Sequence, residues 1–258
     1  MKIVTFNIRC LWDGDGINSF LHRAGLILNK IDEERPDIIA FQEVTDKIAD
    51  FLIDNLCAYE IVGHGRNADY FGEGVYFAYR RETVRLFELN SFWLSDAPHV
   101  PASRYDGQSS HPRTCLEGLF CMGKTIFRVY NIHLDHLPNV MNVREKEVQQ
   151  IIESIKEKND NFPCFVLGDF NALPDEKCVK IFEENGFVDT AHNVGVTFHN
   201  FQGKNYKNGS KIDYIFTDKN TYGKLKKVEK WKDEKDGIFL SDHYPVEAEF
   251  KLSKTLAD

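Results

Sequence analysis

The stretch "CFVLGDFNALPD", residues 164–175, joins an apolar run to a polar end. Its first four residues suit a buried strand, and Asp169 and Asn171 follow shortly after. Side chains two positions apart lie on one face of a strand, so the pattern predicts that Asp169 and Asn171 share a face while Phe170 packs in the core. A single Asp or Asn after a strand is usually a turn former or a helix cap. The stretch therefore indicates a site only if other strands end in the same way.

Five further segments combine a short apolar run with a polar end. Burying polar groups without partners costs about 1–3 kcal/mol each. Six such segments therefore indicate that their polar ends meet at one shared site. The polar residues of the five further segments are Asn7 in "TFNI", Glu43 in "FQEV", His133 in "NIHL", Asp213 in "IDYIF", and Asp242 and His243 in "SDHYPV".

Helical and strand patterns both occur along the chain. Residues 18–36 and residues 140–158 carry apolar side chains at helical spacing. Residues 74–134 and 210–252 are typical mainly of consecutive strands. There is no repeat, low-complexity tract or linker, so we expect one domain, residues 1–258. The mixture predicts an α/β fold in which two packed mixed β-sheets are flanked by helices.

The composition limits the classes of partner. Lys and Arg number 32 and Asp and Glu number 40, which gives a net charge of −8. An acidic protein gains no long-range attraction to a polyanion, which disfavours long duplex nucleic acid but permits a nucleotide, a short nucleic acid or another small phosphate ester. The six cysteines are scattered, and the N-terminus shows no export segment, so we expect a cytoplasmic protein with reduced thiols. No apolar run approaches the roughly 20 residues that cross a bilayer, and nothing in the sequence indicates a membrane or protein partner.

Three of the polar residues are hard oxygen donors. The carboxylates of Glu43 and Asp242 and the carbonyl oxygen of Asn7 suit Mg²⁺, with Mn²⁺ as an alternative. The histidines form no tight cluster of the kind that binds zinc. We therefore predict a magnesium site rather than a zinc site.

The remaining residues supply acid–base and hydrogen-bonding groups. Asn171 offers an amide N–H to a developing oxyanion, and Asp213 is suited to fix the orientation of the His243 ring. A hard divalent ion, oxyanion donors and an activated water together hydrolyse phosphate esters.

In this order the six motifs resemble those of the endonuclease/exonuclease/phosphatase (DNase I-like) superfamily, which includes nucleases, deadenylases and phosphatases. The resemblance spans residues 5–246, and "GDFN" followed later by "SDH" is its most specific part. It implies a four-layer α/β sandwich with the site between two sheets. It also implies metal-dependent cleavage of a phosphodiester or phosphomonoester.

The resemblance also implies a role for each matching residue. Glu43 is similar to the main metal ligand, with Asn7 beside it, and Asp242 is similar to a second carboxylate on the metal side. Arg113 follows a "FWLSDAP" segment like that of bacterial members and is a candidate phosphate-binding residue, although a structural role is comparably expected for a lone arginine. Glu73 is the candidate carboxylate partner of His133.

The resemblance also implies roles for the residues that would carry out catalysis. Asp169 resembles the aspartate that orients or deprotonates the attacking water, and Asn171 resembles the donor to a phosphate oxygen. His243, paired with Asp213, resembles the essential histidine, with the roles of base and of phosphate stabiliser both open. His133 is similar to the histidine near the phosphate and the leaving group.

The substrate is the least constrained part of the prediction. We expect a nucleotide or short single-stranded nucleic acid first, and a sugar or inositol phosphate as the alternative. A catalytically inert binding module of the same fold is disfavoured, because degenerate members should lack one of the aspartates or the final histidine, and this chain has all of Asp169, Asp213, Asp242 and His243.

Three further features leave alternatives open. Trp93, Tyr105 and Phe198 suit either base stacking or the core, with the core favoured for Trp93. The long polar loop 95–112 suits either a lid or a plain surface excursion. Residues 203–235 hold ten lysines against five acidic residues, which suits either a solvated face or a guide for an anionic substrate.

Overall fold

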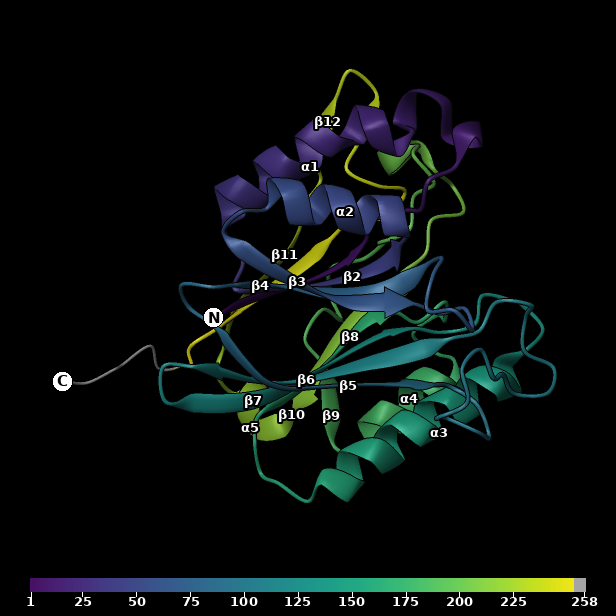
Figure 1. Ribbon diagram of the computed structural model, residues 1–258, viewed down its shortest axis with the longest axis vertical. Coiled ribbons are helices and arrows are strands. Elements are labelled where there is room, and N and C mark those ends of the chain that lie inside the picture. The colour runs from purple at the N-terminus through teal and green to yellow at the C-terminus, as the bar shows by residue number, and fades with distance from the viewer. Residues whose placement is uncertain (253–258) are drawn as a thin grey trace.

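The chain folds into four layers, as Figure 1 shows for the computed structural model, which describes residues 1–252. Residues 253–258 of the expected single domain lie outside the described residues. Two six-stranded sheets pack face to face, and helices cover their outer faces. This arrangement confirms the predicted α/β sandwich of two mixed sheets.

The first sheet has the strand order β11-β14-β1-β2-β4-β3. Strands β1 and β2 are parallel neighbours, whereas the other pairs in this sheet are antiparallel. Its strands are β1 (Lys2–Asn7), β2 (Ile38–Val44), β3 (Tyr59–Gly65), β4 (Gly74–Arg80), β11 (Leu225–Lys230) and β14 (Val246–Phe250).

The second sheet has the order β5-β6-β7-β8-β10-β9, and β7 and β8 are its parallel pair. Its strands are β5 (Arg85–Trp93), β6 (Thr114–Met122), β7 (Thr125–His133), β8 (Cys164–Asp169), β9 (Phe187–Asp189) and β10 (Asp213–Asp218). A separate two-stranded hairpin is formed by β12 (Glu234–Lys235) and β13 (Ile238–Phe239).

Two of the helices match the sequence prediction. The helix α1 (Phe20–Glu34) falls within the expected range and ends at Arg35, whose left-handed φ of 48° precedes Pro36. The helix α3 (Met141–Lys158) coincides almost completely with the second pattern. The remaining helices, which the sequence patterns did not single out, are α2 (Asp46–Asn55), α4 (Lys177–Glu184) and α5 (Lys219–Tyr222), together with the 3-10 helices Asp13–Asn18 and Gly203–Asn205.

Three apolar clusters hold the layers together. The central cluster lies between the sheets and includes Ile38 and Phe77 from one sheet and Phe127 and Phe165 from the other. The other two clusters pack α1 and α2 on the first sheet and α3 and α4 on the second. Because each sheet is covered on both faces, its central strands are buried, and the polar residues at their ends face a shared edge.

Candidate active site

The predicted site residues gather in a cleft of about 390 Å³. In the parallel pairs, Asn7 lies opposite Gln42, one residue before Glu43, and His133 lies opposite Asp169. A hydrogen bond of 3.0 Å from Asn7 to Asp169 brings the strand ends of the two sheets together. The cleft lining includes Glu43, Arg113, His133, Asp169, Asn171, Asp242 and His243, while Asn7 and Asp213 lie behind it and contact lining residues.

Asn7 connects the two sheets through its amide group. Its Nδ2 donates to Oε1 of Glu43 at 2.9 Å and to Oδ2 of Asp169 at 3.0 Å. Its Oδ1 accepts from the backbone N–H of Arg9 at 3.0 Å. Asn7 therefore acts here as a donor that joins the two carboxylates, and metal ligation through its oxygen stays a prediction.

Glu43 is held as a carboxylate at an irregularity near the end of β2, where the pairing with β4 shifts register. Its φ of 61° is unusual for a residue other than glycine and directs the side chain into the cleft. Burial acts to raise the pKa of Glu43, but the hydrogen bonds from Asn7 and from the backbone N–H of Cys10, together with the charge of Arg9, hold that pKa below its ordinary value. The side chain is therefore ionised at neutral pH, as a metal ligand must be.

The opening stretch brings Asp169 and Asn171 together by a turn. Strand β8 ends at Asp169, and Asn171 has a left-handed φ of 47°, so strand alternation does not place it. The backbone N–H of Asn171 donates to Oδ1 of Asp169 at 2.9 Å, and its side-chain Nδ2 donates to the carbonyl oxygen of Leu134 at 3.1 Å. Both residues line the cleft, and Phe170 packs in the core beneath α4 as expected.

Asp169 is buried and surrounded by charged groups. Burial raises the pKa of Asp169 to about 7, His243 opposes the rise, and Asp213 adds to it. A carboxylate with a pKa near neutrality is suited to exchange a proton with water.

Asp213 and His243 form the expected pair. Nδ1 of His243 lies 2.8 Å from Oδ2 of Asp213, and Nε2 of His243 lies 3.8 Å from Oδ2 of Asp169. Burial acts to lower the pKa of His243, but the charges of Asp213 and Asp169 outweigh it and raise this pKa to about 10. The ring is therefore an imidazolium at neutral pH, with Nδ1 donating to Asp213.

Asp242 lies beside the ionised Glu43. Burial and the charge of Glu43 raise the pKa of Asp242, whereas Arg9 acts to lower it. Ser241 Oγ donates to Oδ1 of Asp242 at 3.1 Å, and Nε of Arg9 lies 3.8 Å from Oδ2. Arg9, which also pairs with Asp15 at 3.0 Å, lines the cleft and was not predicted from the sequence.

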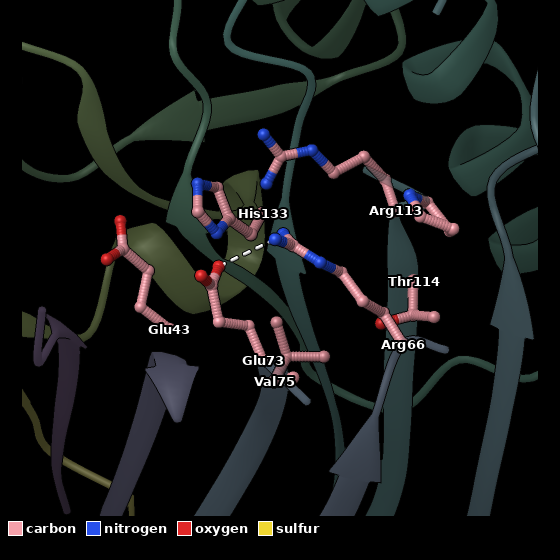
Figure 2. A pocket seen from close by; sticks show the side chains of 9 residues that line it. Glu43, Arg66, Glu73, Val75, Arg113, Thr114 and His133 are labelled. Carbon is pink, nitrogen blue, oxygen red and sulfur yellow. Dashed lines mark ion pairs between the residues drawn. The ribbon is translucent and has the colours of Figure 1, made fainter. Parts of the chain in front are cut away.

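The expected partner of His133 was wrong. Glu73 pairs instead with Arg66, at 2.7 Å between Oε2 and Nη2, as the dashed line in Figure 2 marks. Nε2 of His133 lies 3.5 Å from Oδ2 of Asp169. Burial, with the charges of Arg113 and Arg66, holds the pKa of His133 well below its ordinary value, so the ring is neutral.

Arg113 reaches the cleft from the start of β6. Its side chain is buried, and its Nη2 donates to Nδ1 of His136 at 2.9 Å. Arg66, at the end of β3, extends its guanidinium into the same region (Figure 2). Neither Arg66 nor His136 was predicted, because each lies in a loop where only the tertiary fold brings it to the site.

The donor set at Glu43 and Asp242 fits a hard divalent ion. Glu43 is half-buried and Asp242 is buried, and both line the cleft; the thiol of Cys10 beside them keeps its proton, because burial and the charge of Glu43 raise its pKa. The group Asp169, Asp213 and His243 also lies within metal-binding distances, but the hydrogen bond between Asp213 and His243 already accounts for two of its members.

The structure bears on the aromatic residues and on the lysine-rich segment, whose roles the sequence leaves open. Trp93 and Tyr105 are buried, whereas Phe198 lines the cleft with its ring centroid 5.0 Å from that of His243. Among residues 1–252 no lysine lines the cleft, so the lysine-rich segment 203–235 does not contribute a lysine charge to its wall.

The long loop 95–112 is anchored along its second half. The backbone N–H of Ser109 donates to Oδ2 of Asp135 at 2.9 Å, and Nε2 of Gln108 donates to Oε1 of Glu147 at 2.9 Å. These contacts carry His111 into the cleft wall.

The sequence also predicted reduced thiols and no membrane-spanning segment. All six cysteines are free thiols. Among residues 1–252, no helix combines the length and the apolar character needed to cross a membrane.

Comparisons with known proteins agree with this geometry. The model of the Endonuclease/Exonuclease/phosphatase family matches residues 4–243. An endonuclease/exonuclease/phosphatase from Bacteroides vulgatus is similar at 27% identity and a TM-score of 0.90, with 98% of both chains covered. No curated protein matches the sequence at a significant level.

Two similar structures carry more specific descriptions. A mannosyl-6-phosphatase from Bacteroides thetaiotaomicron is 24% identical, with a TM-score of 0.87 and coverage of 98% of this chain and 100% of the other. TDP2 from D. rerio, in complex with a single-stranded DNA product, is 17% identical, with a TM-score of 0.76 and coverage of 96% and 97%. At these identities the likeness shows the shared fold alone.

Proposed function

Because the chain belongs to the endonuclease/exonuclease/phosphatase family, we propose that it is a divalent-metal-dependent phosphoesterase in which Asp169 activates the attacking water. The single observation that carries this proposal is the contact set around Asp169. Its carboxylate accepts a hydrogen bond from Asn7, which also contacts Glu43, and lies 3.8 Å from Nε2 of His243. Asp169 therefore lies between the residues assigned to the metal and the imidazolium of His243.

We assign the metal to the oxygen donors of the cleft. Glu43 and Asp242 would hold Mg²⁺, or Mn²⁺, with Asn7 beside them. When bound, such an ion lowers the pKa of water and offsets the charge that develops on the phosphate. The lowered pKa of Glu43 supports this assignment, because it keeps the ligand ionised.

Side chains of the protein supply the acid–base and hydrogen-bonding groups. Asp169, with a pKa near neutrality, takes the proton of the attacking water. His243 is held as an imidazolium by Asp213 and donates from Nε2 to a phosphate oxygen, so the role of phosphate stabiliser is favoured over that of base. Asn171 supplies a further amide donor, and neutral His133 lies with its Nε2 3.5 Å from Oδ2 of Asp169.

The size of the cleft supports a small substrate. A volume of about 390 Å³ is at the lower end of the range for sites that enclose small ligands. We propose a nucleotide or the end of a short single-stranded nucleic acid as the substrate, with Phe198 beside the base. A sugar or inositol phosphate is the alternative, since within the described part of the chain Phe198 is the one aromatic residue, apart from the histidines, in the cleft lining. The six free thiols suit the reducing cytoplasm.

The test is hydrolysis of a chromogenic phosphate ester with Mg²⁺ and with excess chelator. We expect hydrolysis only with the ion, and a loss of about 100- to 10,000-fold in kcat for Asp169→Asn, the range for removal of a general base. Asp175→Asn, in the exposed turn after the same strand, is the matched control and should retain the wild-type rate. Wild-type activity in Asp169→Asn would refute the role of Asp169.

A further inference from the structure

A small cavity adjoins the cleft on the side of His133. It measures about 10 Å³, which is close to the space that one water molecule needs. It shares Glu43, Arg66, Glu73, Arg113 and His133 with the wall of the larger cleft. Figure 2 shows the guanidinium groups of Arg66 and Arg113 extending toward His133.

Arg113 lines this cavity and has unused hydrogen-bonding capacity. Its side chain is only 3% exposed, and among residues 1–252 its Nε and Nη1 have no hydrogen-bond partner. A buried donor without a partner is costly, and a buried cation more so, unless an anion completes it. Arg66 is also buried, and its charge is offset by Glu73 at 2.7 Å, whereas no carboxylate pairs with Arg113 within the described chain. The unpaired charge of Arg113 therefore favours an anionic oxygen in the adjoining cavity, although the carboxylates of Glu43 and Glu73 also line it.

We propose that Arg66, Arg113 and His133 form a seat for an unesterified oxygen of the substrate phosphate, so that the enzyme prefers phosphomonoesters to phosphodiesters. This inference rests on the proposed function. A phosphomonoester has three unesterified oxygens and a diester has two. The metal side of the cleft and the side of Asn171 and His243 each take one oxygen, and the seat takes the third.

The size of the seat excludes the second ester group of a diester. The cavity admits about one water-sized group, and its walls include Gly74 and Val75 of β4. A Cβ added at Gly74 would lie 2.0 Å from the carbonyl oxygen of His64, so this wall is already in close contact with its neighbour. A sugar or nucleoside placed in the seat would have to displace both arginines. A diester must therefore leave the seat empty or bind in a strained position.

The first experiment compares 4-nitrophenyl phosphate with bis(4-nitrophenyl) phosphate, which share a leaving group. We expect Arg113→Met to lower kcat/KM for the monoester by about 10- to 100-fold, the effect of losing a charge-assisted hydrogen bond. The diester should lose much less, so the ratio of the two values falls at least about fivefold. Arg81→Met, which removes an exposed arginine in the turn after β4, is the control and should leave the ratio unchanged. Equal losses for both esters, or no loss, would overturn the proposal.

A second variant closes the seat without removing a charge. Val75→Leu adds one methylene to the cavity wall and should lower the monoester rate selectively, as Arg113→Met does. If circular dichroism shows that Arg113→Met does not fold, the proposal is tested by Val75→Leu alone, through the same ratio of kcat/KM for the monoester to kcat/KM for the diester. An unchanged ratio in a folded Val75→Leu protein counts against the seat.

A binding measurement separates this proposal from the proposed function. Calorimetry with inorganic phosphate, in the presence of chelator, should give a Kd at least tenfold weaker in Arg113→Met than in the wild type, and an unchanged Kd in Arg81→Met. If the wild type hydrolyses neither ester with any divalent ion, the proposed function fails, while the phosphate titration still decides the seat. An unchanged Kd in Arg113→Met would overturn the seat even if hydrolysis is confirmed.

Discussion

Replacing Glu147 by glutamine should remove a pH-dependent loss of stability. Glu147, on α3, is fully buried and accepts from Nε2 of Gln108 at 2.9 Å and from the backbone N–H of Asp135 at 3.0 Å. It thereby joins α3 to the loop 95–112 and to the segment after His133, both of which carry cleft residues. Burial raises the pKa of Glu147 from its ordinary 4.5 to about 8, against the opposing effects of the Asp135 N–H and of Arg113.

The sign and size of the effect follow from proton linkage. Between pH 4.5 and pH 8, the folded protein keeps a proton on Glu147 that the unfolded chain has lost, so stability falls as the pH rises. At about 1.4 kcal/mol for each pH unit, the full loss is about 4 to 5 kcal/mol, complete above pH 8. Glu147→Gln cannot ionise, so its free energy of unfolding relative to the wild type should rise by this amount across the interval. The altered hydrogen bond adds a pH-independent offset of about 1 kcal/mol.

The assay is urea unfolding of both proteins at pH 5, 6, 7, 8 and 9. Glu145→Gln, which removes an ion pair of 2.7 Å with exposed Lys177, is the control and should differ from the wild type by less than about 1 kcal/mol at every pH. A difference between Glu147→Gln and the wild type that stays constant from pH 5 to pH 9 would refute the reasoning, because Glu147 would then titrate alike in both states.

Two further predictions concern the strand ends. Asp213→Asn removes the charge that contributes most to raising the pKa of His243. Because kcat falls at alkaline pH when the imidazolium loses its proton, this fall should begin at a lower pH in the variant. A fall at the wild-type pH would show that the Asp213–His243 pair does not control it. Gly168→Ala places a Cβ 2.0 Å from the carbonyl oxygen of Ile132, so the free energy of unfolding in urea should fall by more than about 3 kcal/mol. A fall of less than about 1 kcal/mol would contradict the close approach of β7 and β8.

Much of the fold was predictable from periodicity in the sequence. The long amphipathic patterns predicted α1 and α3, and the apolar runs predicted buried strands in two sheets. The helices α2 and α4 have 10 and 8 residues, and such short segments carry too few turns for a clear period. The order of strands within each sheet was not predicted, since it depends on pairing between distant segments.

The site was predictable where strands deliver the residues. Asp169, Asp213 and His243 lie where the strand-end argument places them, and the predicted pair forms. Asn171 reaches the cleft by a left-handed turn, which strand alternation does not describe.

Residues supplied by loops were the ones that the sequence could not place. Arg9 and Arg66 are single charged residues without a local pattern, and Glu73 was assigned to the wrong partner because a buried arginine lay within reach. Only the paired ends of β3 and β4 bring Arg66 and Glu73 together, and this contact depends on the register of the two strands.

The dependence of phosphate release on free Mg²⁺ tests the central claim most directly, with wild type and Glu43→Gln measured on one substrate. If Glu43 holds the ion that activates the water beside Asp169, the wild type should be inactive in chelator, and Glu43→Gln should need at least tenfold more Mg²⁺ for half-maximal rate. Equal Mg²⁺ curves for the two proteins, or full activity of the wild type in chelator, would contradict the account.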